Sequence, residues 1–183
     1  NIKKLLQRKV LMSTYRDNLL KENNINLNES ALTEDDWFYI SEKLHLSEEF
    51  VTEFKNEIKW DCYVENQLLS EASIRKFQSF LSWNLVSLFQ KLSEEFICEF
   101  QDKVSWIAIS VKQKLSKDFV IDFKHKINWN VYFHYQEVDF SIIKKFATKT
   151  SYGKIDSFHT SHLTESQIDE IQKLLDIKYL FKN

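Results

Sequence analysis

Bulky hydrophobic residues return along this chain at a constant interval. Each tryptophan stands 23 residues after the one before it, and one further step reaches Tyr152. The two most regular columns are the tryptophans Trp37, Trp60, Trp83, Trp106 and Trp129 and the phenylalanines Phe54, Phe77, Phe100, Phe123 and Phe146. An α-helix advances by about 100° per residue, so this interval leaves about 140° beyond six full turns, and the tryptophans would spiral around a single long helix. The sequence therefore predicts a repeat whose units are separated by turns.

Polar residues between these columns predict two helices in each unit. The residue ten positions after each tryptophan favours a helix N-cap. These cap positions hold Ser47, Ser70, Ser93, Ser116 and Asp139. Apolar residues three, four, seven and eleven positions beyond the cap share one helical face, which predicts a "phenylalanine helix" over about residues 47–58 in the first unit. A shorter "tryptophan helix", such as residues 83–90, is expected to be capped by the residue before its tryptophan, as Asp36 could do in the first unit.

One such hairpin cannot bury its apolar side alone, so neighbouring units must stack. We therefore predict an all-α protein, an α-solenoid of about five 23-residue helix-turn-helix repeats with N- and C-terminal capping helices. Residues 31–151 form the repeat array and, with its caps, a single domain. Residues 1–30 form an N-terminal capping helix and polar loop. Residues 152–183 form a degenerate repeat and a C-terminal capping helix that begins after Thr164.

The composition narrows the class of protein further. The chain of 183 residues has no proline and one glycine, whereas β-sandwiches and nucleotide-binding α/β folds need glycine at many tight turns. No stretch approaches 18 uncharged apolar residues, so we expect no secretory signal, no membrane segment and no membrane partner. The only cysteines, Cys62 and Cys98, cannot form a disulfide framework at this length. They favour a reducing, cytoplasmic environment and are expected to be buried, unreactive thiols.

Residues that could perform catalysis or bind a metal are sparse. The sequence has no glycine-rich phosphate loop and no serine-hydrolase or zinc-protease motif. His159 and His162 could share a helical face, but Asp156 is the only obvious third ligand, so a polar surface pair is the better interpretation. We therefore expect a protein that is not an enzyme and that binds no cofactor and no metal.

Two segments are the best copies of the repeat. They are LSEEFICEFQDKVSWIAISVKQKLSKDF at residues 92–119 and LSEEFVTEFKNEIKW at residues 46–60. Both resemble a degenerate LSxxFIxxFxxxVxWxxISxxQ repeat of uncharacterised proteins from large DNA viruses and bacteriophages. The resemblance covers about residues 37–151, with departures such as Ser73 in place of phenylalanine. It implies a viral or mobile-element origin and a protein that engages host machinery in the cytoplasm of the host cell, and it transfers no catalytic residues.

Residues that bind a partner are expected at positions that vary between units, because the recurring columns are needed to build the stack. The fifth and sixth residues after each tryptophan are mostly polar in the first two units and become apolar or aromatic in later ones. In the last three units they are Leu88, Phe89, Val111, Lys112, His134 and Tyr135. Exposed aromatic residues rimmed by charge are typical of interface hot spots, so we predict a partner-binding ridge here. The sequence leaves open whether this side of the helix, with its neighbours Ile107 and Phe133, is buried instead.

These patterns favour a non-enzymatic helical-repeat protein that binds a host protein. Combined with the viral resemblance, they suggest an inhibitor of a host defence enzyme, such as an anti-CRISPR protein. Self-assembly is an alternative, since the stack could continue from one chain to the next if the terminal helices cap it poorly. The sequence does not set the oligomeric state.

A nucleic-acid-binding solenoid is the other alternative. Lysines in the later units could contact phosphates, namely Lys124, Lys126, Lys144 and Lys145. A column of glutamines, at Gln67, Gln90, Gln113 and Gln136, could read bases. However, the glutamines fall on the tryptophan side of the helix, where hydrogen bonds to turn backbone are the better interpretation. The net charge of −5 over residues 31–59 would also repel a phosphate backbone, so a protein partner is favoured.

Overall fold

The computed structural model describes residues 14–15, 17–18, 32–149 and 158–180, and all regular structure within these ranges is helical. The chain divides into two compact units, residues 1–67 and residues 68–183, which are described separately as unit 1 and unit 2. In each unit, helices that alternate along the chain pack against one another. The predicted all-α helical-repeat fold is therefore confirmed.

Unit 1 contains α2 (Glu34–Lys43), α3 (Glu48–Glu53) and α4 (Trp60–Asn66), with α2 packed against α4. The prediction that Asp36 caps the first tryptophan helix is wrong, because α2 begins a turn earlier. Thr33 is the N-cap, and its hydroxyl accepts a hydrogen bond from the Asp36 N–H. The Asp36 carboxylate accepts in return from the Thr33 N–H at 2.8 Å, which completes a capping box.

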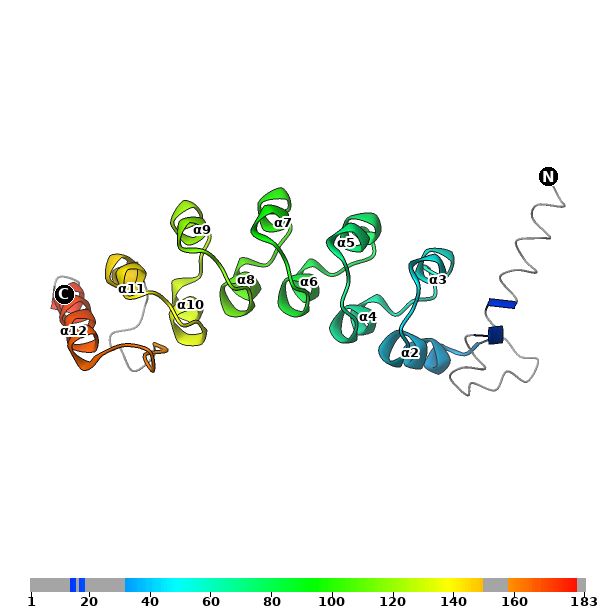
Figure 1. The fold of residues 1–183 in the computed structure, drawn as a ribbon, viewed down its shortest axis with the longest axis horizontal. Helices are drawn as coiled ribbons and strands as arrows, with labels where there is room; N and C mark the ends of the chain where they lie inside the picture. Colours follow the sequence, from blue (N-terminus) through cyan, green and yellow to red (C-terminus); the bar gives the residue numbers. More distant parts are fainter. Residues whose placement is uncertain (1–13, 16, 19–31, 150–157, 181–183) are drawn as a thin grey trace. The chain divides into compact units, whose positions relative to one another are not determined.

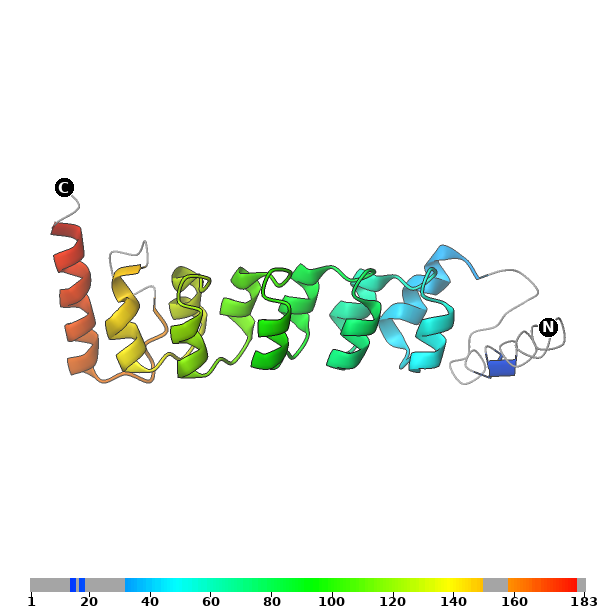
Figure 2. The same ribbon diagram turned by 90° about the horizontal axis from the view of Figure 1, so that it is seen from above.

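Unit 2 holds the remaining helices in two rows. They are α5 (Glu71–Phe77), α6 (Trp83–Phe89), α7 (Glu94–Glu99), α8 (Trp106–Lys112), α9 (Lys117–Asp122), α10 (Trp129–Tyr135), α11 (Phe140–Phe146), the 3₁₀ helix η1 (Ala147–Lys149) and α12 (Glu165–Leu180). The tryptophan helices α6, α8 and α10 form one row and the phenylalanine helices α5, α7, α9 and α11 the other (Figure 1). Seen from above, the helices of unit 2 stand side by side (Figure 2).

The phenylalanine helix is shorter than its apolar pattern predicts. In the first repeat the expected helix over residues 47–58 ends at Glu53, and Phe54 is the C-cap. The Phe54 carbonyl then accepts hydrogen bonds from the N–H groups of Glu57 and Ile58, both at 3.0 Å. This turn places the side chain of Ile58 in the core. A helix that continued to residue 58 would have placed it on the same side. The equivalent Leu81, Val104 and Ile127 are likewise buried.

Recurring ring clusters form the core of the repeats. Each cluster joins a tryptophan to two phenylalanines: Trp37 with Phe50 and Phe54, Trp83 with Phe96 and Phe100, and Trp106 with Phe119 and Phe123. The two phenylalanine ring centroids of a cluster lie 4.5–4.6 Å apart. The indole N–H of Trp60, Trp106 and Trp129 donates to the carbonyl five residues earlier, at 2.8–3.1 Å. Trp106 thus shares its ring cluster with Trp37 and Trp83, and its indole hydrogen bond with Trp60 and Trp129.

A buried serine ties each of three tryptophan helices to the next repeat. Ser41, Ser87 and Ser110 have no solvent exposure. The hydroxyl of Ser110 donates to the Trp106 carbonyl at 2.6 Å and accepts from the Asn128 N–H at 3.0 Å. Ser87 makes the same pair of bonds with Trp83 and Ser105. The serine therefore satisfies the otherwise unpaired N–H at the start of the following tryptophan helix.

The glutamine column ties each repeat to the one before it. The side-chain amide of Gln113 donates to the carbonyls of Ser87 and Gln90 at 3.1 and 2.8 Å. Its side-chain oxygen accepts from the Leu92 N–H at 3.2 Å. Gln67 and Gln136 likewise donate to carbonyls of the preceding tryptophan helix. The prediction that these glutamines bond turn backbone is confirmed for Gln90 and Gln113, which accept from the N–H groups of Leu69 and Leu92. Gln67 and Gln136 instead satisfy carbonyls that a helix end leaves open.

The polar pattern changes at the C-terminal end of the repeats. Phe133 stands at the serine position, and its ring stacks on Phe158 with centroids 4.9 Å apart, while its carbonyl accepts from the His159 N–H. The predicted C-terminal helix is confirmed as α12, which Thr164 caps by accepting from the Gln167 N–H at 3.3 Å. α12 packs against α11 and η1, so it covers the last hairpin.

Much of the two predicted end regions lies outside the described residues. This applies to most of residues 1–30 and to residues 152–157, which include the one glycine. Residues 14–15 and 17–18 are helical. The Tyr15 ring lies 6.1 Å from that of Phe50, and its hydroxyl is 2.6 Å from the Ser47 hydroxyl. Tyr15 therefore packs against the first phenylalanine helix of unit 1.

The buried phenol of Tyr132 predicts a loss of stability in alkali. Burial, with a smaller effect of the Glu94 charge, raises the pKa of Tyr132 to about 12 from its ordinary value of 10.0. Below pH 10 its protonated form stabilises the folded state fully, and this contribution is lost as the pH rises from 10 to about 12. We expect Tyr132→Phe to reduce the alkaline loss of unfolding free energy by about 2–3 kcal/mol, measured by urea unfolding across that range. Tyr135→Phe, at an exposed position, should retain the loss, and a Tyr132→Phe profile identical to wild type would contradict the prediction.

Candidate functional site

The two rows of helices in unit 2 differ in charge. Over their whole length α6, α8 and α10 contain no acidic residue, and Lys112 and His134 are their only basic ones. The phenylalanine helices carry Glu71, Arg75, Lys76, Glu94, Glu95, Glu99, Lys117, Asp118, Asp122, Lys144 and Lys145. A helix whose outer side faces only water normally has charged and polar residues there. The row of tryptophan helices therefore lacks the composition of an ordinary solvated face.

The outer side of this row exposes large hydrophobic side chains. Phe89 is 44% exposed, Ile107 59% and Tyr135 58%. Lys112 and His134 are also exposed, and Leu88 and Val111 are half-buried. We call this set the tryptophan-helix surface: Leu88, Phe89, Ile107, Val111, Lys112, His134 and Tyr135. The ridge residues predicted from the sequence thus lie at the surface of unit 2, whereas Phe133 is buried.

Helical geometry explains why these side chains share one side. The tryptophan and the residues three and four positions later point into the stack, as Ile109 and Ser110 do in α8. Residues one, five and six positions after the tryptophan then point outward, because successive residues are about 100° apart. α6 contacts α8 and α8 contacts α10. At about 8–10 Å between neighbouring axes, the surface extends about 16–20 Å from α6 to α10.

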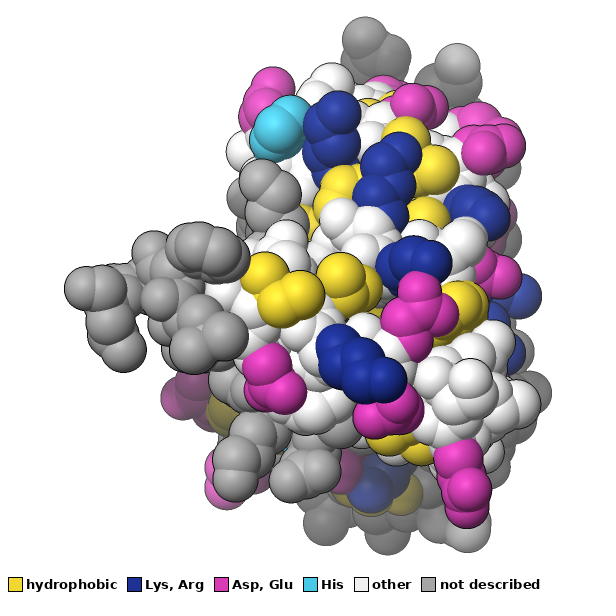
Figure 3. Space-filling view, turned by 90° about the vertical axis from the view of Figure 1, so that its left-hand side faces the viewer, with side chains coloured by type: hydrophobic (Ala, Val, Ile, Leu, Met, Phe, Trp, Pro, Cys, Tyr) yellow, Lys and Arg dark blue, Asp and Glu magenta, His cyan; other side chains and the backbone are white. Residues whose placement is uncertain are grey.

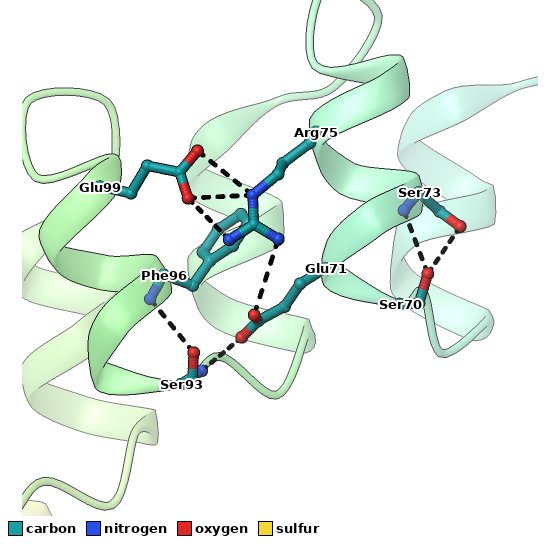
Figure 4. Close-up of polar contacts among 7 residues, drawn as sticks. All are labelled: Ser70, Glu71, Ser73, Arg75, Ser93, Phe96 and Glu99. Carbon is teal, nitrogen blue, oxygen red and sulfur yellow. Dashed lines mark hydrogen bonds and ion pairs between the residues drawn. The ribbon is translucent and has the colours of Figure 1, made fainter.

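The opposite side of unit 2 pairs its own charges, as Figure 4 shows for one network. The Arg75 guanidinium donates to the Glu99 carboxylate at 2.6–3.2 Å and lies 4.8 Å above the centre of the Phe96 ring. This hydrogen bonding raises the pKa of Arg75 and lowers that of Glu99. Glu71, 3.9 Å from Arg75, accepts from the Ser93 N–H at 2.7 Å. These charges therefore connect consecutive repeats.

The repeat position of Glu71 changes its charge in a later repeat, and the residue that it contacts changes with it. Glu94 occupies the place of Glu71 one repeat later and accepts from the N–H and hydroxyl of Ser116. In the next repeat a lysine, Lys117, stands at this place, and the cap that follows is Asp139 rather than serine. The two side chains form an ion pair at 3.6 Å. The charges at this position of the phenylalanine helices are thus explained by contacts between consecutive repeats.

Three of the four lysines predicted as nucleic-acid contacts are held by neighbouring groups. Lys126 pairs with Asp102 at 3.0 Å, and Lys144 pairs with Glu170 at 2.5 Å. Lys145 lies 5.5 Å from the centre of the Phe146 ring. Lys124 is exposed and lines an open pocket with His125, Ile127, Trp129 and Phe146. Contacts within the stack therefore account for three of these four lysines.

The other candidate residues make local contacts. His159 and His162 have ring centroids 6.0 Å apart, and each ring has its own partner, the Ser161 hydroxyl at 3.0 Å and the Val138 carbonyl at 2.8 Å. Asp156 lies outside the described residues. Among the residues that the structure describes, no group of three or more His, Cys, Asp or Glu side chains could hold a metal ion.

The expectation of buried thiols is wrong for Cys98. Its side chain is exposed, because it follows the buried Phe96 and Ile97 on α7 and points away from the stack. Cys62 is half-buried, and burial raises the pKa of its thiol. Both cysteines are free.

The outer side of α12 is mixed in character. Ile177 is an exposed hydrophobic residue there, whereas Lys173 pairs with Asp169 at 2.6 Å. The view of this end in Figure 3 shows lysine and acidic side chains among smaller hydrophobic areas. Charged outer faces are typical of helices that cap a repeat array.

Two features of the tryptophan-helix surface were not predicted from the sequence. One is the absence of acidic residues from three consecutive tryptophan helices, which reading each helix sequence alone would have revealed. The other is a pair of exposed lysines, Lys91 and Lys114, in the turns that follow α6 and α8.

No protein-family model matches this sequence, and comparison with curated proteins and with solved structures gave no match. Within the described ranges, no helix has the length and apolar character needed to cross a bilayer.

Proposed function

We propose that this is a non-enzymatic helical-repeat protein that binds a protein partner through the tryptophan-helix surface. The observation that carries the proposal is the exposure of Phe89, Ile107 and Tyr135 on three adjacent helices that contain no acidic residue. The cores of protein interfaces are depleted of charge and enriched in aromatic residues. Contiguous apolar patches on a surface mark interaction sites.

The composition of the surface supports a protein partner over nucleic acid. Interfaces with nucleic acid are more polar and much more positively charged than those between proteins. Here aliphatic side chains such as Leu88, Ile107 and Val111 separate the aromatic ones. Of the predicted phosphate contacts, Lys126 and Lys144 are in ion pairs with carboxylates.

In its narrower form the proposal makes the partner a host protein in the cytoplasm of the host cell. The protein would then inhibit a host defence enzyme, as an anti-CRISPR protein does. This form is supported by the resemblance of the repeat motif to repeats in proteins of large DNA viruses and bacteriophages.

Selection of displayed random peptides on the immobilised full chain tests the proposal before the natural partner has been identified. Peptides of about 16 residues suffice, because a helix of that length extends about 24 Å and spans the surface. We expect the double variant Phe89→Ser and Tyr135→Ser to weaken binding of the selected peptides by about a hundredfold, since aromatic hot spots dominate interface energies. Fluorescence anisotropy with labelled peptides measures the change.

A matched control is available in unit 1. Phe38 and Tyr39 are 47% and 48% exposed, so changing both to serine removes a similar exposed aromatic area. This control should bind the peptides as tightly as wild type, and both double variants should keep the wild-type melting temperature. Peptides that bind the Phe89 and Tyr135 variant as tightly as wild type would count against the proposed surface.

A further inference from the structure

We propose that the partner segment bound by the tryptophan-helix surface is acidic and carries aromatic or aliphatic side chains. This inference rests on the proposed function and adds the chemical class of the partner. It derives from the charges that border the surface, which are cationic over α6 and α8. The exposed side chains that define this border are Lys91, Lys112 and Lys114.

These lysines lie close to the exposed hydrophobic residues. Lys112 is the last residue of α8, at the repeat position that Phe89 occupies in α6 and Tyr135 in α10. Lys91 and Lys114 each stand two residues further on, in the turn after the C-cap glutamine. One edge of the surface therefore alternates aromatic residues with ammonium groups.

Within the described part of the chain, these three lysines form no ion pair. On the other side of unit 2, three lysines are in ion pairs: Lys117 with Asp139, Lys126 with Asp102 and Lys144 with Glu170. Among the described residues, Lys124 and Lys145 on that side form no ion pair. Lys103 donates to the Gln78 side chain and lies over the Trp83 ring. Lys91, Lys112 and Lys114 thus place cations without a carboxylate partner beside the apolar surface, where a carboxylate from a bound segment could pair with them.

An acidic residue enters this border only after α10. The turn residue after the C-cap is Lys91 after α6, Lys114 after α8 and Glu137 after α10. We therefore place the carboxylates of the bound segment over α6 and α8 and its uncharged part toward Tyr135. His134, whose ring centroid is 4.6 Å from that of Tyr135, lies at the end of the surface that would face the uncharged part of the segment.

A single-stranded nucleic acid is the other polyanion that combines with lysine and aromatic side chains. It is disfavoured because the aliphatic residues beside these three lysines offer a base neither a hydrogen bond nor an aromatic ring to stack on. A labelled uridine oligonucleotide therefore belongs in the test. Binding of that oligonucleotide, lost on changing Lys91 and Lys114 to glutamate, would overturn the assignment of an acidic protein segment.

The peptides selected on the full chain provide the test. We expect them to combine aspartate or glutamate with aromatic or aliphatic residues, and to bind more weakly as ionic strength rises. The double variant Lys91→Glu and Lys114→Glu should weaken their binding by about tenfold, since it replaces attraction with repulsion at two border positions. The double variant Lys124→Glu and Lys145→Glu makes the same change in net charge on the opposite side, and should stay within about twofold of wild type.

The outcomes separate this inference from the proposed function. Neutral or basic peptides that depend on Phe89 and Tyr135 but not on Lys91 and Lys114 would overturn the acidic partner and leave the surface in place. Peptides whose binding does not depend on Phe89 and Tyr135 would overturn both the proposed function and this inference. A selection that yields no binder would do the same. Equal weakening by the two lysine variants would also overturn the inference, because only net charge would then matter.

Discussion

Replacing Phe96 with alanine is expected to lower the free energy of unfolding by about 3–5 kcal/mol. The Phe96 side chain has no solvent exposure. Its ring centroid lies 4.6 Å from that of Phe100 and 6.3 Å from that of Trp83, and the Arg75 guanidinium lies over its outer face. Truncation would leave a cavity among rigid rings that cannot move in to fill it. Urea unfolding followed by circular dichroism measures the loss.

Phe89→Ala is the matched control for this prediction. It removes the same atoms from a residue that is 44% exposed, and we expect it to change the unfolding free energy by no more than about 0.5 kcal/mol. The contrast also tests the orientation of the tryptophan helices, because a comparable loss for Phe89→Ala would mean that this side of α6 is packed. The tryptophan-helix surface would then not exist as described.

Gln113→Leu is expected to cost about 3–5 kcal/mol although it conserves volume and adds apolar character. The substitution removes three hydrogen bonds, two donated to the carbonyls of Ser87 and Gln90 and one accepted from the Leu92 N–H. The backbone groups left behind are buried between repeats, and each unsatisfied group costs about 1–3 kcal/mol. Denaturant unfolding monitored by tryptophan fluorescence reports the loss.

Gln136→Leu provides the comparison within the same column. Gln136 is half-buried, and its amide donates to the Val111 carbonyl, so we expect a loss of about 1 kcal/mol. Because neighbouring repeats stabilise one another, Gln113→Leu should also broaden the unfolding transition of unit 2. Equal effects of the two substitutions would show that the glutamines fill space rather than link the repeats.

The repeat, the caps of the phenylalanine helices and the hydrogen bonding of the glutamines to backbone could be predicted because each leaves a periodic signal in the sequence. The end of the phenylalanine helix could not. Ile58 falls on the same face as Phe50 and Val51 whether the chain reaches it by helix or by a turn, so apolar spacing does not distinguish the two. The backbone of Phe54, with φ −104° and ψ 25°, ends the helix without glycine or proline to mark the place.

Exposure of the tryptophan-helix surface was beyond sequence reasoning for a related reason. In α8, apolar residues stand on every side of the helix, at Ile107, Ala108, Ile109 and Val111. This is the pattern of a helix that is buried all round. Only the arrangement of the rows shows which side faces the stack and which faces outward. The identity of the border lysines also depends on this arrangement, because an ion pair such as that of Lys126 with Asp102 cannot be read from the sequence.

The serine and glutamine bonds reach only as far as the adjacent repeat, and this locality affects how such a gene can change. Duplicating or deleting one whole 23-residue segment within unit 2 keeps the serines and glutamines in register with their backbone partners. Losing a single codon would displace the tethers that span the deletion from their targets. Descendants of this sequence can therefore gain or lose length in whole modules, and the span of the binding face can be adjusted by copy number without redesign of the interior.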